Sequence, residues 1–125
     1  MKITYQRAFD AATAMKDIMT AKGLCGASQI KIVRLWRELG EHVKTVSEAD
    51  SMLASEYGTI GENGVVVFFD DSKRPEFLRR RAEMLSEMVD VTPISIVDEE
   101  AFWAASSPNV LSALDGLILF EEEKQ

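Results

Sequence analysis

The sequence contains one cysteine and one histidine, Cys25 and His42. An internal disulfide needs two cysteines, and a zinc site built from cysteine and histidine needs three or four such ligands. The composition therefore argues against both kinds of site within these 125 residues. A chain without an internal disulfide is also typical of the reducing cytosol, so we expect a cytoplasmic protein.

Long apolar runs and phosphate-binding motifs are missing as well. The longest apolar runs, residues 65–69 and 117–120, are far shorter than the roughly 20 residues that span a bilayer. Asp10 and Asp17 interrupt the region where the apolar part of a secretory signal would lie. Neither Gly-x-Gly-x-x-Gly nor a P-loop occurs. We therefore expect neither a membrane partner nor a bound cofactor.

Positive charge is scarce in the second half of the chain. The whole sequence holds 14 Lys and Arg against 21 Asp and Glu, a net charge of −7. Residues 59–125 carry six of these basic residues and fourteen of the acidic ones. Because an acidic surface repels a phosphate backbone, direct binding to nucleic acid is not expected.

What the sequence does contain is a long amphipathic stretch, residues 28–57. Its apolar side chains recur at steps of three and four residues, at Ile32, Leu35, Leu39, Val46, Ala49 and Leu53. That spacing predicts one helix of about thirty residues. His42 fills the gap in the stripe, and Trp36 and Val43 widen it on one side. We predict that Trp36, His42 and Val43 lie at a partner interface, either with a second copy or with another protein.

The remaining chain predicts short elements around this helix. Thr4 is a candidate N-cap of a first helix that ends near Lys22. The Asn63-Gly64 turn predicts a hairpin with residues 65–69, a continuous apolar run typical of a strand covered on both faces.

A third helix is expected over residues 74–89, with Phe77, Leu78, Leu85, Met88 and Val89 inward. A strand follows at 94–97, and Asp98 is a candidate cap for a short helix after it. A further short helix from Pro108, a last strand or coil at 117–120 and a solvated acidic tail at 121–125 complete the chain. We therefore predict a single domain, residues 1–125, of the α+β class and dominated by helix: a long central helix, two or three further helices and two or three short strands.

Five basic residues stand out in the acidic half of the chain: Lys73, Arg74, Arg79, Arg80 and Arg81. Arginine can hold a phosphate or carboxylate with two parallel hydrogen bonds, so this group is the candidate anion-binding site. The alternative is that these residues pair with glutamates of the same helix.

Catalytic constellations are not evident. No acid or nucleophile is placed to orient His42, and Cys25 lies outside any known nucleophile motif. Residues 122–124, Glu-Glu-Lys, match the acidic-x-Lys end of metal-dependent nucleases, but nothing selects a second carboxylate. A metal-dependent enzyme therefore has the least support, and we expect no catalytic and no metal-binding residue.

Several packing and turn motifs are similar to those of one protein family. Residues 29–35, the Glu56-Tyr57-Gly58 helix end, the turn at 62–64 and the segments 77–78, 84–89 and 93–96 resemble small uncharacterised proteins encoded by bacteriophages and prophages. The resemblance implies a phage context, with no catalytic residue to carry over.

Two hypotheses on function follow from these observations. The first is a non-enzymatic interaction or assembly protein that acts through its long helix in the cytoplasm of the infected or lysogenic bacterium, or in association with the virion. It would bind itself, another phage protein or a host protein. The second is an anti-defence inhibitor. Such a protein would either mimic nucleic acid with its acidic half or sequester an anionic signal on Arg79, Arg80 and Arg81.

Overall fold

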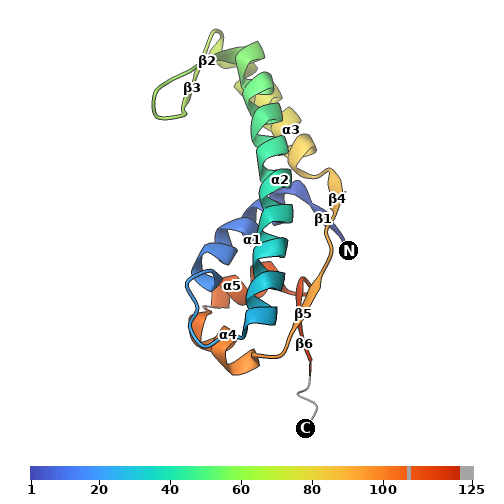
Figure 1. Ribbon diagram of the computed structural model, residues 1–125. Coiled ribbons are helices and arrows are strands. Elements are labelled where there is room, and N and C mark those ends of the chain that lie inside the picture. Colours follow the sequence, from blue (N-terminus) through green and yellow to red (C-terminus); the bar gives the residue numbers. More distant parts are fainter. Residues whose placement is uncertain (107, 122–125) are drawn as a thin grey trace.

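The computed structural model describes residues 1–106 and 108–121, and its elements are arranged around one long helix, α2 (Figure 1). In chain order the elements are β1 (Lys2–Thr4), α1 (Tyr5–Ile18), α2 (Gly26–Tyr57), β2 (Gly58–Ile60), β3 (Val66–Phe68), the 3-10 helix η1 (Asp71–Lys73), α3 (Arg74–Leu85), β4 (Met88–Asp90), β5 (Ile94–Ile96), α4 (Glu99–Ala105), α5 (Pro108–Leu114) and β6 (Ile118–Phe120). The helix-dominated α+β class is confirmed, with more short elements than expected. Of the predicted acidic tail only Glu121 lies within the described residues, and it is exposed.

The predicted stripe of α2 is its buried face. Ile32, Leu35, Leu39, Val46 and Leu53 are all buried along this helix. At 1.5 Å per residue, its 32 residues extend over about 48 Å. The helix ends where the sequence predicts, at the residue before a glycine, and it begins two residues earlier than predicted.

Helix α1 begins after Thr4, whose hydroxyl oxygen accepts a hydrogen bond from the Arg7 backbone N–H at 3.1 Å. This N-cap was predicted, but the helix ends at Ile18, four residues before Lys22. The Thr20 hydroxyl donates to the Asp17 carbonyl at 2.9 Å. Such a local side-chain bond competes with the next helical turn, which accounts for the early end.

A residue from far along the chain caps the start of α2. Ser28, the first residue of the predicted stretch and a residue type common at helix N-caps, does not cap this helix but is buried in its first turn. We also expected Asp98 to cap the helix that follows it, and Asp98 does stand at the N-cap position of α4, but its side chain makes no cap hydrogen bond there. Instead an Asp98 carboxylate oxygen accepts a hydrogen bond from the Cys25 backbone N–H at 3.0 Å. The carboxylate thereby satisfies a donor at the N-terminus of the long helix.

Asp98→Asn is therefore expected to lower the melting temperature at neutral pH, but not in acid. Hydrogen bonds from the Cys25 backbone, the Ser28 hydroxyl and the Cys25 thiol lower the pKa of Asp98 below its ordinary value. A lowered folded-state pKa gives stabilisation that is complete above the unfolded pKa and disappears as the pH falls through the folded one. The difference in melting temperature between wild type and variant, measured by circular dichroism, should vanish at low pH.

Glu100→Gln is the matched control, because it removes the same charge from an exposed position in α4. It should change the melting temperature little at either pH. If Asp98→Asn lowered the melting temperature as much in acid as at neutral pH, the stabilising role of the Asp98 carboxylate would be contradicted.

The main core lies around the first half of α2. Helix α1 packs against both α2 and α5, and β5 packs against α2 (Figure 1). We use the term main core for its buried residues: Ile3, Ala8, Ala11, Ala14, Met15, Ile18, Ile32, Leu35, Leu39, Val91, Ile94, Ile96, Phe102, Val110, Leu114, Leu117 and Ile118. Residues from both ends of the chain therefore meet on the same half of the long helix.

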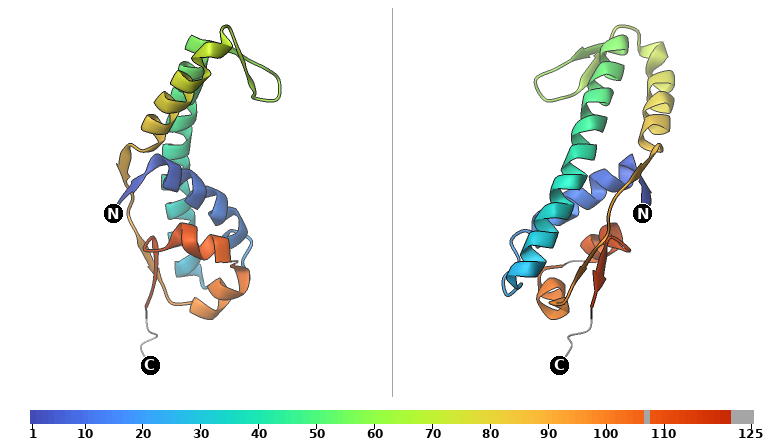
Figure 2. Two further views of the ribbon diagram at one scale, coloured as in Figure 1. Left: turned by 180° about the vertical axis from the view of Figure 1, so that it is seen from behind. Right: turned by 45° about the vertical axis from the view of Figure 1, so that its right-hand side comes forward.

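A second, smaller cluster lies around the other end of α2. Its buried residues are Leu53, Ala54 and Tyr57 from α2 and Phe77 from α3. Figure 2 shows α3 and the β2–β3 hairpin at this end and α1, α4 and α5 at the other. One uninterrupted helix thus takes part in both clusters.

The strands form three two-stranded sheets. β1 pairs antiparallel with β4, β2 antiparallel with β3, and β5 parallel with β6. The first pairing corrects the predicted third helix, which ends at Leu85 because Met88 and Val89 enter β4. Their backbone partners come from β1, at the other end of the chain. Leu78 and Met88, both predicted to point inward, are exposed.

The predicted hairpin is present, but its environment differs from the prediction. Thr59 pairs with Val67, and Gly64 adopts a positive φ of 77° in the turn, as the Asn-Gly sequence indicates. The expectation that residues 65–69 are covered on both faces is wrong, because Val65, Val67 and Phe69 are exposed. Helices α2 and α3 supply apolar side chains to one face of the hairpin alone.

Candidate functional site

The end of α2 that lies away from the main core carries the hairpin arm, which we define as residues 50–85. It comprises the last two turns of α2, the β2–β3 hairpin, η1 and α3. Figure 2 shows this arm extending away from α1, α4 and α5 in both views. The arm is therefore the part of the molecule that reaches furthest from the main core.

Aromatic packing fixes the inner face of the hairpin. Val66 and Phe68 pack against the second cluster, and the ring centroid of Phe68 lies 5.4 Å from that of Phe77. The Phe77 centroid lies 5.6 Å from that of Tyr57, and the Arg74 guanidinium lies 4.5 Å from the Phe68 centroid. Edge-to-face ring pairs and a cation over a ring are both favourable contacts. One face of the hairpin is thus held on the two helices.

The outer face of the hairpin, by which we mean Val65, Val67 and Phe69, is apolar and exposed. The three residues expose 58%, 62% and 70% of their surface. Because side chains alternate along a strand, all three lie on the side opposite Val66 and Phe68. Single exposed apolar residues are ordinary, whereas a contiguous group commonly marks a contact with another molecule. This face is the candidate interaction surface.

Two arginines of the basic group join α3 to α2. An Arg80 Nη donates to the Glu56 carboxylate and, at 3.1 Å, to the Tyr57 hydroxyl. These hydrogen bonds, the one to Tyr57 first, raise the pKa of Arg80. The Arg81 Nε lies 2.9 Å from the Asp50 carboxylate. The partners thus belong to the neighbouring helix, and the pairing within α3 that we considered for Arg80 is not observed.

The other basic residues lie near the start and middle of α3. Lys73 lies 3.9 Å from the Glu76 carboxylate, and Arg74 lies 3.3 Å from that of Asp71. Arg79 is exposed. Four of the five basic residues therefore already have a carboxylate partner, so an incoming anion would compete with those carboxylates. Anion binding by this group stays a prediction.

Trp36, His42 and Val43, which we predicted to form a partner interface on α2, differ in their exposure and in their contacts within the chain. The His42 Nε2 lies 3.2 Å from the Asp90 carbonyl oxygen, and its ring makes an edge contact with Tyr5 at 6.2 Å between centroids. His42 thus links α2 to β4 and the start of α1. Val43 is half-buried, and Trp36 is 40% exposed. A partner contact at Trp36 and Val43 stays a prediction.

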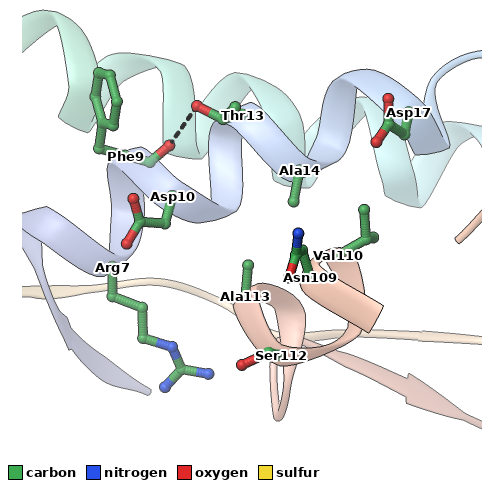
Figure 3. Close-up of a pocket in the computed structure, with 10 residues that line it drawn as sticks. All are labelled: Arg7, Phe9, Asp10, Thr13, Ala14, Asp17, Asn109, Val110, Ser112 and Ala113. Carbon is green, nitrogen blue, oxygen red and sulfur yellow. Dashed lines mark hydrogen bonds between the residues drawn. The ribbon is translucent and has the colours of Figure 1, made fainter. Parts of the chain in front are cut away.

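A groove of about 660 Å³ runs along the contact between α1 and α5 and is lined by residues of both helices (Figure 3). Ala14 on α1 and Ala113 on α5 point toward the opposite helix, and both belong to or pack against the main core. The Arg7 guanidinium donates to the Asp115 carbonyl, and Asp10 accepts a hydrogen bond from the glutamine four residues before it. These charged groups are engaged with their own neighbours and do not form an acid–base pair across the groove. The sequence patterns did not reveal this groove.

No family model, no curated protein and no solved structure matches the chain. The similarity to small phage-encoded proteins therefore stays a prediction.

Within residues 1–106 and 108–121, no three His, Cys, Asp or Glu side chains gather as they would around a metal ion. The Glu-Glu-Lys motif at 122–124 lies outside the described residues. In the same ranges, no helix combines the length and the apolar character needed to cross a membrane.

Proposed function

We propose that this chain is a non-enzymatic interaction or assembly protein that contacts its partner through the outer face of the hairpin. The observation that carries the proposal is the exposure of Val65, Val67 and Phe69 on an arm that extends away from the main core. Burying such a face on a partner removes apolar surface from water, which is the main favourable term in most protein association.

The proposal changes the role of the long helix. From the sequence we predicted that a partner binds α2 itself, at Trp36, His42 and Val43. In the structure, α2 packs in both clusters and holds the hairpin at one end. The helix then acts as a support, and the hairpin makes the contact.

The biological setting is part of the same proposal. The packing and turn motifs that resemble phage and prophage proteins support a phage-encoded accessory role in the bacterial cytoplasm. The single cysteine of the sequence is consistent with that compartment. We rank this role above the sequestering of an anionic signal, because four of the five basic residues are paired with carboxylates.

A photo-crosslinking amino acid placed at Val67 in the bacterial cell tests the proposal. We expect discrete adducts from this position, identified by mass spectrometry as one protein or a small set of proteins, a second copy included. Ile30 is the matched control, because it is 63% exposed against 62% for Val67 but lies at the opposite end of α2. Equal adducts from both positions, or none from Val67, would show that the hairpin is not an interaction surface.

A further inference from the structure

The hydrogen bonds of the hairpin show which backbone groups remain free. Phe69 N–H donates to the Tyr57 carbonyl and Gly61 N–H to the Val65 carbonyl, both at 2.9 Å. Bonded and non-bonded residue pairs alternate in an antiparallel ladder, so Thr59 and Val67 form the bonded pair between these two. The backbone N–H and C=O groups of Val66 and Phe68, the neighbours of Val67, therefore point to the other side, along the outer edge of β3.

The outer edge of β2 has one of its backbone N–H groups already bonded to α2. Gly58 N–H donates to the Ala54 carbonyl at the end of α2, and Gly58 is buried. β3 has its main contacts with β2. Of the two edges of this hairpin, that of β3 is therefore the one open to a further strand.

Apart from its short length of three residues, this edge lacks the usual protection against pairing. Proteins commonly block exposed strand edges with lysine, proline or a bulge, because such an edge is a template for another chain. Residues 65–69 are Val-Val-Val-Phe-Phe, with no charge and no proline. Left open, this stretch would pair without control, whereas a symmetric pairing of two copies would close it.

We propose that β3 pairs antiparallel with β3 of a second copy, about a two-fold axis at Val67, and so forms a four-stranded sheet. This inference rests on the proposed function, since it names the partner at the same hairpin. In this register Val66 of each copy lies opposite Phe68 of the other, and their free N–H and C=O groups form four backbone hydrogen bonds. Val65 lies opposite Phe69 of the second copy, an aromatic and β-branched cross-strand pair of the kind that stabilises sheets.

The charges next to β3 fit this register. Counting outward from Val67, Asp70 falls opposite Gly64 of the second copy, and Asp71 falls opposite Asn63. Neither carboxylate meets a like charge, and an asparagine amide can donate to a carboxylate. A shift by two residues would instead place Asp70 opposite Val66 or Gly64 opposite Phe68. All five apolar residues of one copy face apolar residues of the other only in the register centred on Val67.

The apolar area of the outer face is too small for stacking of two such faces to hold a stable dimer by itself. From the exposures of its three residues, the outer face presents roughly 350 Å². A stable interface buries about 800 Å² on each partner, so stacking two outer faces would not suffice. Pairing at the edge adds the four hydrogen bonds and the cross-strand contacts. The result is a weak, reversible dimer, for which we expect a dissociation constant of about 10–100 µM.

Sedimentation equilibrium of the full chain between about 5 and 500 µM tests the proposal. We expect wild type to fit a monomer–dimer equilibrium and Val67→Lys to raise the dissociation constant at least about tenfold, because the two lysines would meet at the axis. Thr59→Lys is the matched control: Thr59 lies directly opposite Val67 on the same face but in β2, away from the new edge. It should leave the dimer unchanged.

A disulfide at the axis gives a second, independent measurement. Residues on a two-fold axis in a non-bonded pair have Cα atoms about 4.5 Å apart, within the range that a disulfide spans. In a Cys25→Ser background, Val67→Cys should form a covalent dimer on air oxidation, whereas Thr59→Cys should not. Equal dimer formation by the two variants would overturn the register.

Other results separate this inference from the proposed function. A wild-type chain that stays monomeric at every concentration, a dimer that Val67→Lys does not weaken, or growth beyond a dimer would each overturn the pairing. If Val67 nevertheless crosslinks to a different protein in the cell, the interaction role stands and only the second copy is rejected. A monomer without crosslinks at Val67 would remove both.

Discussion

Phe77→Ala is expected to unfold the part of the hairpin arm that follows α2, residues 58–85, while the main core stays folded. Phe77 is 3% exposed and belongs to a cluster of only four buried residues. Truncating a buried phenylalanine costs about 3–5 kcal/mol, a large share of what so small a cluster supplies. The main core lies on the other half of α2 and does not contain Phe77. Hydrogen exchange should therefore show lost protection across residues 58–85, with α1 and the first half of α2 still protected.

Leu78→Ala is the control for this experiment. Leu78 is the next residue in α3 and is 53% exposed, so its truncation should change stability by no more than about 0.5 kcal/mol. If the amides of the main core also lost their protection against hydrogen exchange in Phe77→Ala, the main core and the second cluster would unfold as one unit. Unchanged protection would show that the hairpin does not depend on the aromatic packing.

Gly58→Ala is expected to break the pairing of β2 with β3. The φ of Gly58 is −178°, an extended value that any residue adopts, so the reason for glycine is space and not backbone strain. A Cβ at this position would lie 2.1 Å from the Val67 carbonyl oxygen, a backbone atom that cannot move without breaking the ladder. We expect a loss of about 3 kcal/mol, measured by chemical denaturation, and faster exchange of the Thr59 and Val67 amides.

Gly40→Ala is the matched control, and it should change stability in the opposite direction. Gly40 lies inside α2, and a Cβ there would meet no atom within 4 Å. Alanine is the better helix former by roughly 0.5–1 kcal/mol, so the variant should be more stable than wild type. A destabilised Gly40→Ala, or a Gly58→Ala as stable as wild type, would contradict the packing around these two glycines.

The long helix and the hairpin turn were predictable because their signals are local. The stripe from Ile32 to Leu53 keeps its spacing of three and four residues, with His42 in its one gap, and a glycine follows the last helical residue, so the end of α2 could be placed to the residue. The Asn63-Gly64 pair likewise specifies a tight turn on its own, and Gly64 has the positive φ that this turn needs.

Elements that depend on distant partners were not predictable in the same way. Met88 and Val89 continue a helical pattern in the sequence, but β1 pairs with them from the other end of the chain. Asp98 has the residue type of a helix cap, and its position next to Cys25 follows only from the folded chain. The arginines of α3 similarly find Glu56 and Asp50 on α2, which intrahelical spacing does not reveal.

The outer face of the hairpin shows a different limit. A run of five apolar residues is compatible with a strand covered on two faces or on one, since the pattern is the same in both cases. Whether both faces of the strand are covered depends on how many other elements pack against it. Here α2 and α3 cover only the face that carries Val66 and Phe68. The side chains of residues 65–69 do alternate between a covered and an exposed face. Because the exposed residues Val65, Val67 and Phe69 are apolar as well, the sequence does not reveal this alternation.

The position of the hairpin at one end of a helix of about 48 Å has a consequence for the geometry of any dimer. Two copies joined at β3 would form an elongated particle with the main cores at its two ends, which should sediment more slowly than a compact dimer of the same mass. The groove between α1 and α5 would then occur twice, at a fixed separation. A target with two matching sites would be held by both, and the second contact would benefit from the effective concentration that the first provides.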